Sequence, residues 1–275
     1  MCLCSGEAAA QTQNSFNAMN RERLYKTEAV ILKRTDFGEA DRLLTVYTPD
    51  YGKLRLIAKG IRKPTSRKAG HLELFNHARL LVAKGRELDI VTQAETVNAF
   101  RALRKDLVRT SYAHYVAELL DKFTAERDKN RALFNLLLET LTRLCEESEL
   151  DKAVRYYEIH LLTLAGYRPE LFVCVKCRSP LKPVVNYFSP ADGGILCPRC
   201  GEGKDNATPI SVNALKVLRF MQTREYDLCR RLNLSRSLRV EIEAHLRRHI
   251  VYYLEKGLKS VEFILKLRED TKEVR

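Results

Sequence analysis

Residues 42–59 form the stretch RLLTVYTPDYGKLRLIAK, in which two apolar segments flank the turn sequence Pro49-Asp50-Tyr51-Gly52. Such a sequence favours a tight turn, because proline presets its own φ and glycine adopts positive φ without strain. The flanking segments Arg42–Thr48 and Lys53–Lys59 therefore predict a β-hairpin. Its second strand alternates apolar and basic side chains: Leu54, Leu56 and Ala58 against Lys53, Arg55 and Lys59.

Three further strand candidates surround this hairpin. Thr27–Lys33 precedes it, and Glu73–Ala83 and Glu87–Glu95 follow it on either side of Lys84-Gly85-Arg86. None of the connections contains a helix long enough for a parallel crossover. Five short strands in about seventy residues predict a small antiparallel barrel. The five-stranded OB-fold, which commonly binds oligonucleotides, fits the count. An SH3-like barrel is the alternative.

Helical periodicity begins after Ala94. Apolar residues recur at helical spacing in four successive segments, which predicts a helical bundle. These segments are Asn98–Leu107, Ser111–Arg127, Arg131–Cys145 and Asp151–Ala165. Gly166 and Pro169 end the last of them. Beyond an aperiodic stretch, Ser211 is a predicted cap for Val212–Gln222, and Ser235 for a longer helix that ends near Gly257.

The chain is therefore expected to be an α+β multidomain protein, since 275 residues, 45% of them apolar, allow more than one packed core. We expect a flexible N-terminal tail (1–23), an OB-fold DNA-binding domain (24–96), a first helical part (97–170), an inserted Cys4 zinc-binding module (171–206) and a second helical part (207–275).

Two Cys-x-x-Cys pairs, Cys174/Cys177 and Cys197/Cys200, lie in the aperiodic stretch. Two such pairs can close a tetrahedral thiolate shell around one zinc ion, and four thiolates leave no open position for substrate. The sequence thus predicts a structural zinc, with an iron–sulfur cluster as the alternative. Gly201 is expected to relieve crowding beside the second pair. Cys145, on an apolar helical stripe, is expected to be buried.

The formal net charge is +13, which favours a polyanionic partner such as nucleic acid. An anionic membrane surface and simple solubility charge are alternatives. No apolar run reaches the length of a membrane span. Met1–Asn20 lacks the basic and apolar regions of a secretion signal, so we expect a cytoplasmic location, with Met1 or Met19 as the start. In that reducing compartment, the cysteines favour metal binding over disulfides.

The basic residues concentrate at the barrel. Residues 51–70 contain seven basic residues and no acidic one. Such a strand face and loop can follow a phosphate backbone without recognising bases, although a solvated charged face is the alternative. The candidate DNA-binding residues, three of them on neighbouring segments, are Lys33, Arg34, Arg42, Lys53, Arg55, Lys59, Arg62, Lys63, Arg67 and Lys68. Tyr47 and Tyr51 are candidates for base stacking or for the core. A second basic region, Lys216–Arg248, is interrupted by acidic residues.

Several catalytic signatures are missing. The sequence has no GxxxxGK[ST] loop and no GxGxxG motif. His245 and His249 are four residues apart, but the glutamate of a HExxH zinc site is absent between them. We therefore interpret both as surface or core histidines, and we expect a binding protein rather than an enzyme.

The order Gly38-Glu39-Ala40-Asp41-Arg42-Leu43, then Gly52-Lys53, then Ala58–Lys63 resembles the amino-terminal domain of the RecO family. Ala29–Arg34 also resembles that domain, and the two cysteine pairs resemble the zinc-bearing members. Leu258-Lys259-Ser260 is similar to the family's carboxy-terminal helices. The resemblance extends from about residue 24 to 265.

This resemblance implies an OB-fold, a helical middle and a zinc module. It implies a cytoplasmic, nucleoid-associated protein of DNA repair that binds single- and double-stranded DNA and anneals complementary strands. The implied partners are RecR, often RecF, and the acidic carboxy-terminal tail of single-strand DNA-binding protein, with RecA recombinase loaded onto the coated strand. Two other classes remain open: a zinc-ribbon nuclease or modifying enzyme, and an RNA-, ribosome- or transcription-associated module.

Overall fold

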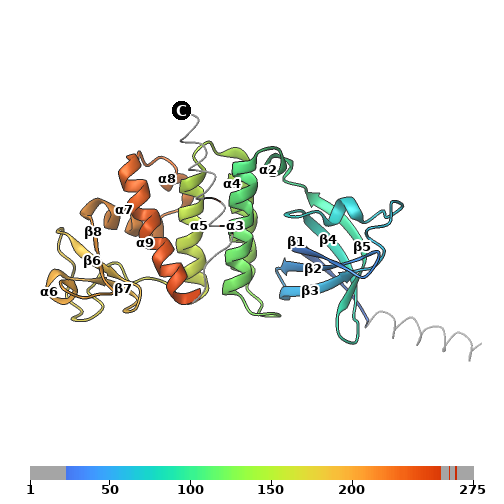
Figure 1. The fold of residues 1–275 in the computed structure, drawn as a ribbon, viewed down its shortest axis with the longest axis horizontal. Coiled ribbons are helices and arrows are strands. Elements are labelled where there is room, and N and C mark those ends of the chain that lie inside the picture. The colour runs from blue at the N-terminus through green and yellow to red at the C-terminus, as the bar shows by residue number, and fades with distance from the viewer. Residues whose placement is uncertain (1–22, 255–259, 261–263, 265–275) are drawn as a thin grey trace, which may run out of the picture. The chain divides into compact units, whose positions relative to one another are not determined.

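The computed structural model describes residues 23–254, 260 and 264, which form two compact units (Figure 1). The first unit contains residues 23–100 and 125–134, and the second contains residues 101–124 and those from 135 onward. Several predictions fall outside the described residues. They are the tail before residue 23 with both start residues, the helix end near Gly257, and Leu258-Lys259.

Five strands close into a barrel in the first unit. They are β1 (Leu24–Phe37), β2 (Asp41–Thr48), β3 (Gly52–Ala58), β4 (His77–Ala83) and β5 (Asp89–Asn98). The order around the barrel is β1-β2-β3-β5-β4, which confirms the predicted five-stranded OB-fold. The expectation of purely antiparallel pairing is wrong at one seam, where β3 and β5 run parallel. A closed ring with an odd number of strands cannot alternate direction throughout, so one parallel pair is required.

The predicted hairpin of residues 42–59 is present, with Tyr47 opposite Lys53 and Arg42 opposite Ala58. Its alternation is confirmed, because Leu54, Leu56 and Ala58 are buried in the barrel core while Arg55 is exposed. The strand predicted over Glu73–Ala83 is shorter than expected. Residues Ala69–Leu72 form a 3-10 helix (η1), and Phe75 has a φ of 65°, which is incompatible with a strand.

A later segment, Ala125–Phe134, packs with the barrel although it lies within the predicted helical part 97–170. The amide of Arg127 donates to the carbonyl of Lys53 (2.8 Å). Gly52 allows this approach, because a Cβ atom there would lie 1.9 Å from the carbonyl oxygen of Asp128. The predicted domain boundaries stay a prediction. Helical periodicity in the sequence does not indicate that Ala125–Phe134 packs with the barrel.

The second unit contains the helices, which follow the predicted periodicity. They are α2 (Arg101–Lys105), α3 (Leu107–Phe123), α4 (Arg131–Glu146, whose first turn belongs to the first unit), α5 (Leu150–Leu164), α7 (Val212–Thr223), α8 (Tyr226–Cys229) and α9 (Arg236–Leu254). The predicted caps are confirmed: Ser211 accepts from the amide of Ala214 (3.1 Å), and Ser235 from that of Leu238 (3.3 Å). Helix α3 begins four residues earlier than expected because Asp106 caps it.

Residues between α5 and α7 form a small sheet of β6 (Asn186–Ser189), β7 (Gly194–Leu196) and β8 (Thr208–Ile210), in the order β7-β6-β8, with the short helix α6 (Pro198–Gly201). Helix α9 lies against this sheet (Figure 1), where Phe188 of β6 contacts His245 and His249 at ring-centroid distances of 5.4 Å. No helix in the described part of the chain combines the length and apolar character needed to cross a lipid bilayer.

Candidate functional site

The four cysteines of the two pairs come from both sides of β7. Cys174 and Cys177 lie on a turn closed by the amide of Arg178 on the carbonyl of Cys174 (2.8 Å). The amide of Val175 donates to the carbonyl of Ile195 (2.9 Å), which fixes this turn to β7. Cys197 follows β7 directly as the N-cap of α6, and Cys200 lies within that helix. The sheet thereby brings together two pairs that are far apart in the sequence.

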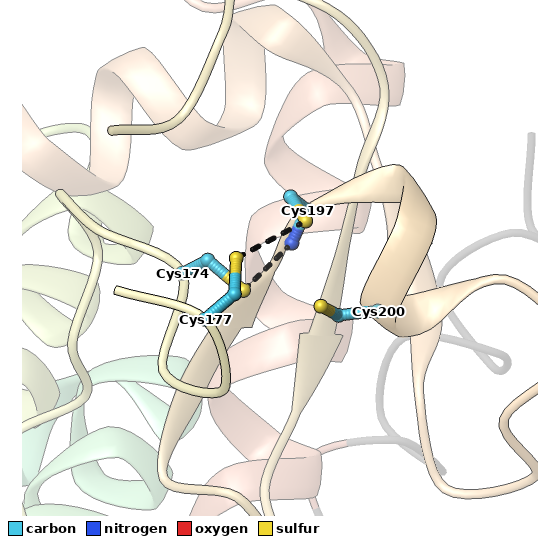
Figure 2. Close-up of side chains that lie close together, drawn as sticks. All are labelled: Cys174, Cys177, Cys197 and Cys200. Carbon is cyan, nitrogen blue, oxygen red and sulfur yellow. Dashed lines mark hydrogen bonds between the residues drawn. The ribbon is translucent and has the colours of Figure 1, made fainter. Parts of the chain in front are cut away.

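The four sulfur atoms point toward one another (Figure 2) and all lie within 4.8 Å of each other. The sulfurs of Cys177 and Cys197 are 3.8 Å apart. Tetrahedral zinc with Zn–S bonds of about 2.3 Å places its sulfur ligands about 3.8 Å apart. The amide of Cys197 also donates to the sulfur of Cys174 (3.3 Å), a contact that stabilises a thiolate. Both the spacing and the donor set therefore fit one metal ion.

The thiols differ in acidity. A hydrogen bond with the Ser179 hydroxyl lowers the pKa of Cys177 to about 6. The pKa of Cys200 is raised to about 12, first by its hydrogen bond with Cys197 and then by burial and the neighbouring sulfurs. Four thiolates this close repel one another unless a cation compensates their charge. The cluster is therefore suited to a divalent ion, and with four protein ligands its role would be structural.

Gly201 is required beside this cluster, but for a reason that differs from the prediction. A Cβ atom at this position would lie 2.5 Å from the Cβ of Tyr187 on β6. Close packing of α6 on the sheet, rather than crowding at the sulfurs, excludes a side chain here. Outside the cluster, Cys145 is only partly buried, less than expected.

His245 and His249 are core residues, the second of the two interpretations left open by the sequence. His245 is 3% exposed and His249 is fully buried. Burial lowers the pKa of His245 to about 4, an effect opposed by Glu241 and supported by Arg248. Burial also lowers the pKa of His249, although its Nε2 lies 3.0 Å from the carbonyl oxygen of Tyr167. Both imidazoles are thus neutral parts of the contact between the small sheet and α9.

We expect this contact to be lost on acidification. Because both pKa values lie below the unfolded value of about 6.5, the unfolded chain binds more protons, so stability is complete above pH 6.5 and falls as pH drops toward 4. His245 alone accounts for up to about 3 kcal/mol. Unfolding free energies measured by urea titration from pH 7.5 to 5 should show this slope. The slope should be smaller in a His245→Gln variant, and an unchanged slope would contradict the assignment.

Part of the predicted basic set lies at one end of the barrel, whereas Lys53 lies at the other end, beside the β2–β3 turn. The β1–β2 turn at Gly38 and the loop after β3 lie together, because the amide of Arg62 donates to the carbonyl of Ala40 (2.9 Å). Asp41 also accepts from the amide of Gly60 (2.7 Å). The loop of residues 59–68 is therefore fixed at its start to the tip of the β1–β2 hairpin.

Acidic partners from other segments pair with part of the basic set, which the acid-free window of residues 51–70 did not indicate. Asp36 lies 2.8 Å from Arg42 and 3.5 Å from Arg62. The guanidinium of Arg42, followed by that of Arg62, lowers the pKa of Asp36. The remaining paired cations are Arg34 with Glu73 (2.6 Å), Arg55 with Glu126 (3.9 Å) and Lys68 with the carbonyl of Val91 (2.9 Å).

Four of the ten predicted residues are exposed and have no pairing partner among the described residues. These are Lys33, Lys59, Lys63 and Arg67. Lys53 is half-buried on the same strand face as Arg55. Tyr47 is fully buried, so it is a core residue and cannot stack on a base. Tyr51 is partly exposed, and its ring packs on that of Tyr25 at a centroid distance of 4.8 Å. Phe37 is also exposed, but no pattern in the sequence pointed to it apart from its position directly before the turn residue Gly38.

Part of the second basic region, Lys216–Arg248, is engaged in contacts within the unit. Arg219 donates to the carbonyl of Leu171 (2.7 Å), and Arg239 contacts Glu149 and Asp151. Arg247 and Arg248 line a pocket of about 520 Å³ between α9 and the small sheet. Its other lining residues are Pro190, Ala191, Asp205, Asn206, Thr208, Val251 and Tyr252. The pocket thus combines an apolar wall with two guanidinium groups and one carboxylate, that of Asp205.

Two family models match the chain. One, described as "Recombination protein O N terminal", matches residues 19–100, and the other, "Recombination protein O C terminal", matches residues 104–262. The chain is 43% identical over 249 residues to "DNA repair protein RecO" of Roseiflexus sp., which covers 90% of this chain and 88% of that protein. It is 41% identical over 243 residues to the protein of the same name from Dehalococcoides mccartyi, covering 88% and 96%.

Proposed function

Because the chain belongs to the RecO family of DNA repair proteins, we propose that it acts as a recombination mediator. In this function it binds single- and double-stranded DNA, anneals complementary strands and, with RecR and often RecF, helps to load recombinase onto strands coated by single-strand DNA-binding protein. Annealing involves no covalent chemistry. It requires two strands held close while their charge repulsion is screened, which a basic surface provides. Zinc at the four cysteines would have a structural role.

The observation that carries this proposal is the cationic end of the barrel. Lys59, Lys63 and Arg67 are exposed on one loop and, among the described residues, have no ion-pair partner. Lys33 extends the set onto β1. Unpaired exposed cations bind phosphates without first losing an internal ion pair, and phosphate contacts are independent of sequence. An OB-fold commonly binds oligonucleotides on its second and third strands and on the loop between its first two strands. The loop of Lys59 and Lys63 is bound to that first turn through the amide of Arg62.

The experiment that tests the mediator function is strand annealing. Complementary oligonucleotides coated with single-strand DNA-binding protein are mixed with and without the chain, and duplex formation is followed by fluorescence. Faster annealing supports the proposal. A rate unchanged at saturating protein would contradict it.

Replacing Lys59, Lys63 and Arg67 by alanine should weaken binding to every single-stranded sequence to the same extent. Each phosphate contact contributes roughly 0.7 to the slope of log affinity against log salt, so the slope should decrease in magnitude by about two. Fluorescence anisotropy titrations at several salt concentrations measure it. The control is alanine at Lys129 and Arg131, which pair with Asp50 at the opposite end of the strands. An equal loss in the control would indicate net charge instead of specific contacts.

We further propose that the acidic tail of single-strand DNA-binding protein docks in the pocket lined by Arg247, Arg248, Val251 and Tyr252. Such a tail requires guanidinium groups for its carboxylates and an apolar surface for its hydrophobic end. Tyr252 is 50% exposed, and Val251 adds a second apolar side chain to the wall.

Arg247→Glu together with Arg248→Glu should weaken binding of a fluorescent tail peptide at least tenfold, because two attractions become repulsions. The alanine variant of the barrel loop at Lys59, Lys63 and Arg67 is the matched control and should bind the peptide like the unmodified chain. Titrations at low salt measure both. Unchanged peptide affinity in the glutamate variant would place the docking surface elsewhere.

A further inference from the structure

Phe37 is the last residue of β1 and lies at the tip of the β1–β2 hairpin, next to Gly38 with its φ of 58°. Its side chain is 52% exposed, more than that of any tyrosine considered above, and it lies outside the barrel core cluster. Its cross-strand partner is Asp41, whose carboxylate accepts from the loop amide of Gly60. A phenylalanine in this position contributes little to the stability of the barrel.

Both guanidinium groups and carboxylates surround Phe37. The guanidinium of Arg62 donates to the carbonyl of Gly38 (3.4 Å), the residue next to Phe37. Asp36, on its other side, contacts both Arg42 and Arg62, so two guanidinium groups face one carboxylate. Glu39 and Asp41 of the same turn add two more carboxylates, so the charge directly beside the ring is mixed. The exposed cations without a pairing partner among the described residues lie next to this turn, at Lys63, which follows Arg62 directly, and at Lys33 on β1. Single exposed apolar residues are common, but this one lies next to cations that attract phosphate.

The strand geometry adds Lys33 to the same face. Successive side chains of a strand point to opposite sides, so Lys33, Thr35 and Phe37 share the outer face of β1, and all three are exposed. Lys33 of β1 lies opposite Thr45 of β2, and Thr45 lies opposite Arg55 of β3. A cation and an aromatic ring thus lie about 13 Å apart along one exposed strand face. A single strand that follows this face would have its backbone at Lys33 and a base at Phe37.

We infer that Phe37 is a stacking platform for a base of single-stranded DNA, placed at the edge of the cationic surface. This inference rests on the proposed DNA binding and adds to it the residue that contacts bases. Stacking tolerates any sequence, because every base has a π-face, so the contact agrees with binding that is not sequence-specific. It also favours single strands, since duplex bases are already stacked.

The test uses the absence of tryptophan from the whole sequence. A Phe37→Trp variant carries one tryptophan, whose fluorescence should be quenched by an oligonucleotide but much less by an abasic strand of equal length and charge. Tyr51→Trp, at the β2–β3 turn on the other end of the strands, is the matched reporter and should respond weakly to both. Equal quenching of the two reporters, or equal quenching by intact and abasic strands, would overturn the inference.

Phe37→Ala provides a second measurement. It should weaken binding of the intact strand at least about fivefold, leave binding of the abasic strand unchanged and keep the salt slope, because no charge is removed. Circular dichroism verifies the fold. If the unmodified chain binds DNA and Phe37→Ala binds intact strands equally well, this inference is wrong while the proposed function stands. If the unmodified chain binds no DNA, the proposed function itself is wrong.

Discussion

A Cys197→Ser variant is expected to lose its bound metal and, with it, the folded structure of residues 171–206. Cys197 is the N-cap of α6 and directly follows β7, and its amide contacts the sulfur of Cys174. The free energy of metal binding is folding free energy in such a module, about 10–16 kcal/mol for structural zinc sites. Loss of one of four thiolates from a closed shell should therefore have the largest effect of any single substitution in this protein.

Elemental analysis of the purified chain should find about one zinc per chain before the substitution and almost none after it. Replacement of the metal by cobalt gives a visible spectrum that distinguishes a four-thiolate tetrahedral site from an iron–sulfur cluster. Cys145→Ser is the matched control, since this cysteine is partly buried on α4 and lies outside the cluster. Full metal content and unchanged thermal stability in Cys197→Ser would contradict the assignment.

A Glu158→Gln variant is expected to destabilise the second unit by about 3–5 kcal/mol. Glu158 on α5 is fully buried, accepts from the hydroxyl of Tyr115 (2.6 Å) and lies 3.0 Å from Arg155. Burial alone would lower the pKa of Arg155, but Glu158 and Glu243 raise it above its ordinary value. Glutamine keeps the shape and the acceptor for Tyr115, but it removes the carboxylate nearest to the buried guanidinium, whose other carboxylate neighbour, Glu243, lies 3.9 Å away.

Urea unfolding followed by far-ultraviolet circular dichroism measures this effect, because the helices belong to the second unit. The double variant Arg155→Met with Glu158→Gln should recover most of the stability, since it also removes the buried charge. The control is Asp227→Asn, a substitution in an ion pair whose two side chains are both exposed. Asp227 lies 3.4 Å from Arg230, and its loss should cost less than about 1 kcal/mol. A double variant as unstable as the single one would show that packing, not charge, explains the loss.

Local patterns in the sequence were sufficient for several elements. The alternation of Leu54, Arg55 and Leu56 gave the strand and its buried face, because side chains of a strand alternate regardless of the rest of the fold. Ser211 and Ser235 marked helix starts, since a cap acts on amides two or three residues away. The spacing of the cysteines likewise indicated a metal site whose sulfurs the small sheet brings within 4.8 Å.

Other features depended on distances between remote segments. The partners of Arg34, Arg42 and Arg55 are Glu73, Asp36 and Glu126, of which Glu126 returns from the far side of α3 to the barrel. Residue counts in a window cannot find such acids, since ion pairing depends on separation in space.

The parallel pairing of β3 with β5 was also beyond local patterns, because it follows from closure of the barrel. The exposure of Phe37 was as well, since local sequence does not distinguish this residue from a core phenylalanine. The sequence by itself determined most of the barrel strands and long helices, the four candidate metal ligands and the excess of positive charge. Only the tertiary structure decided which cations remain unpaired and which aromatic ring is exposed, because both depend on what other segments bring within a few ångströms.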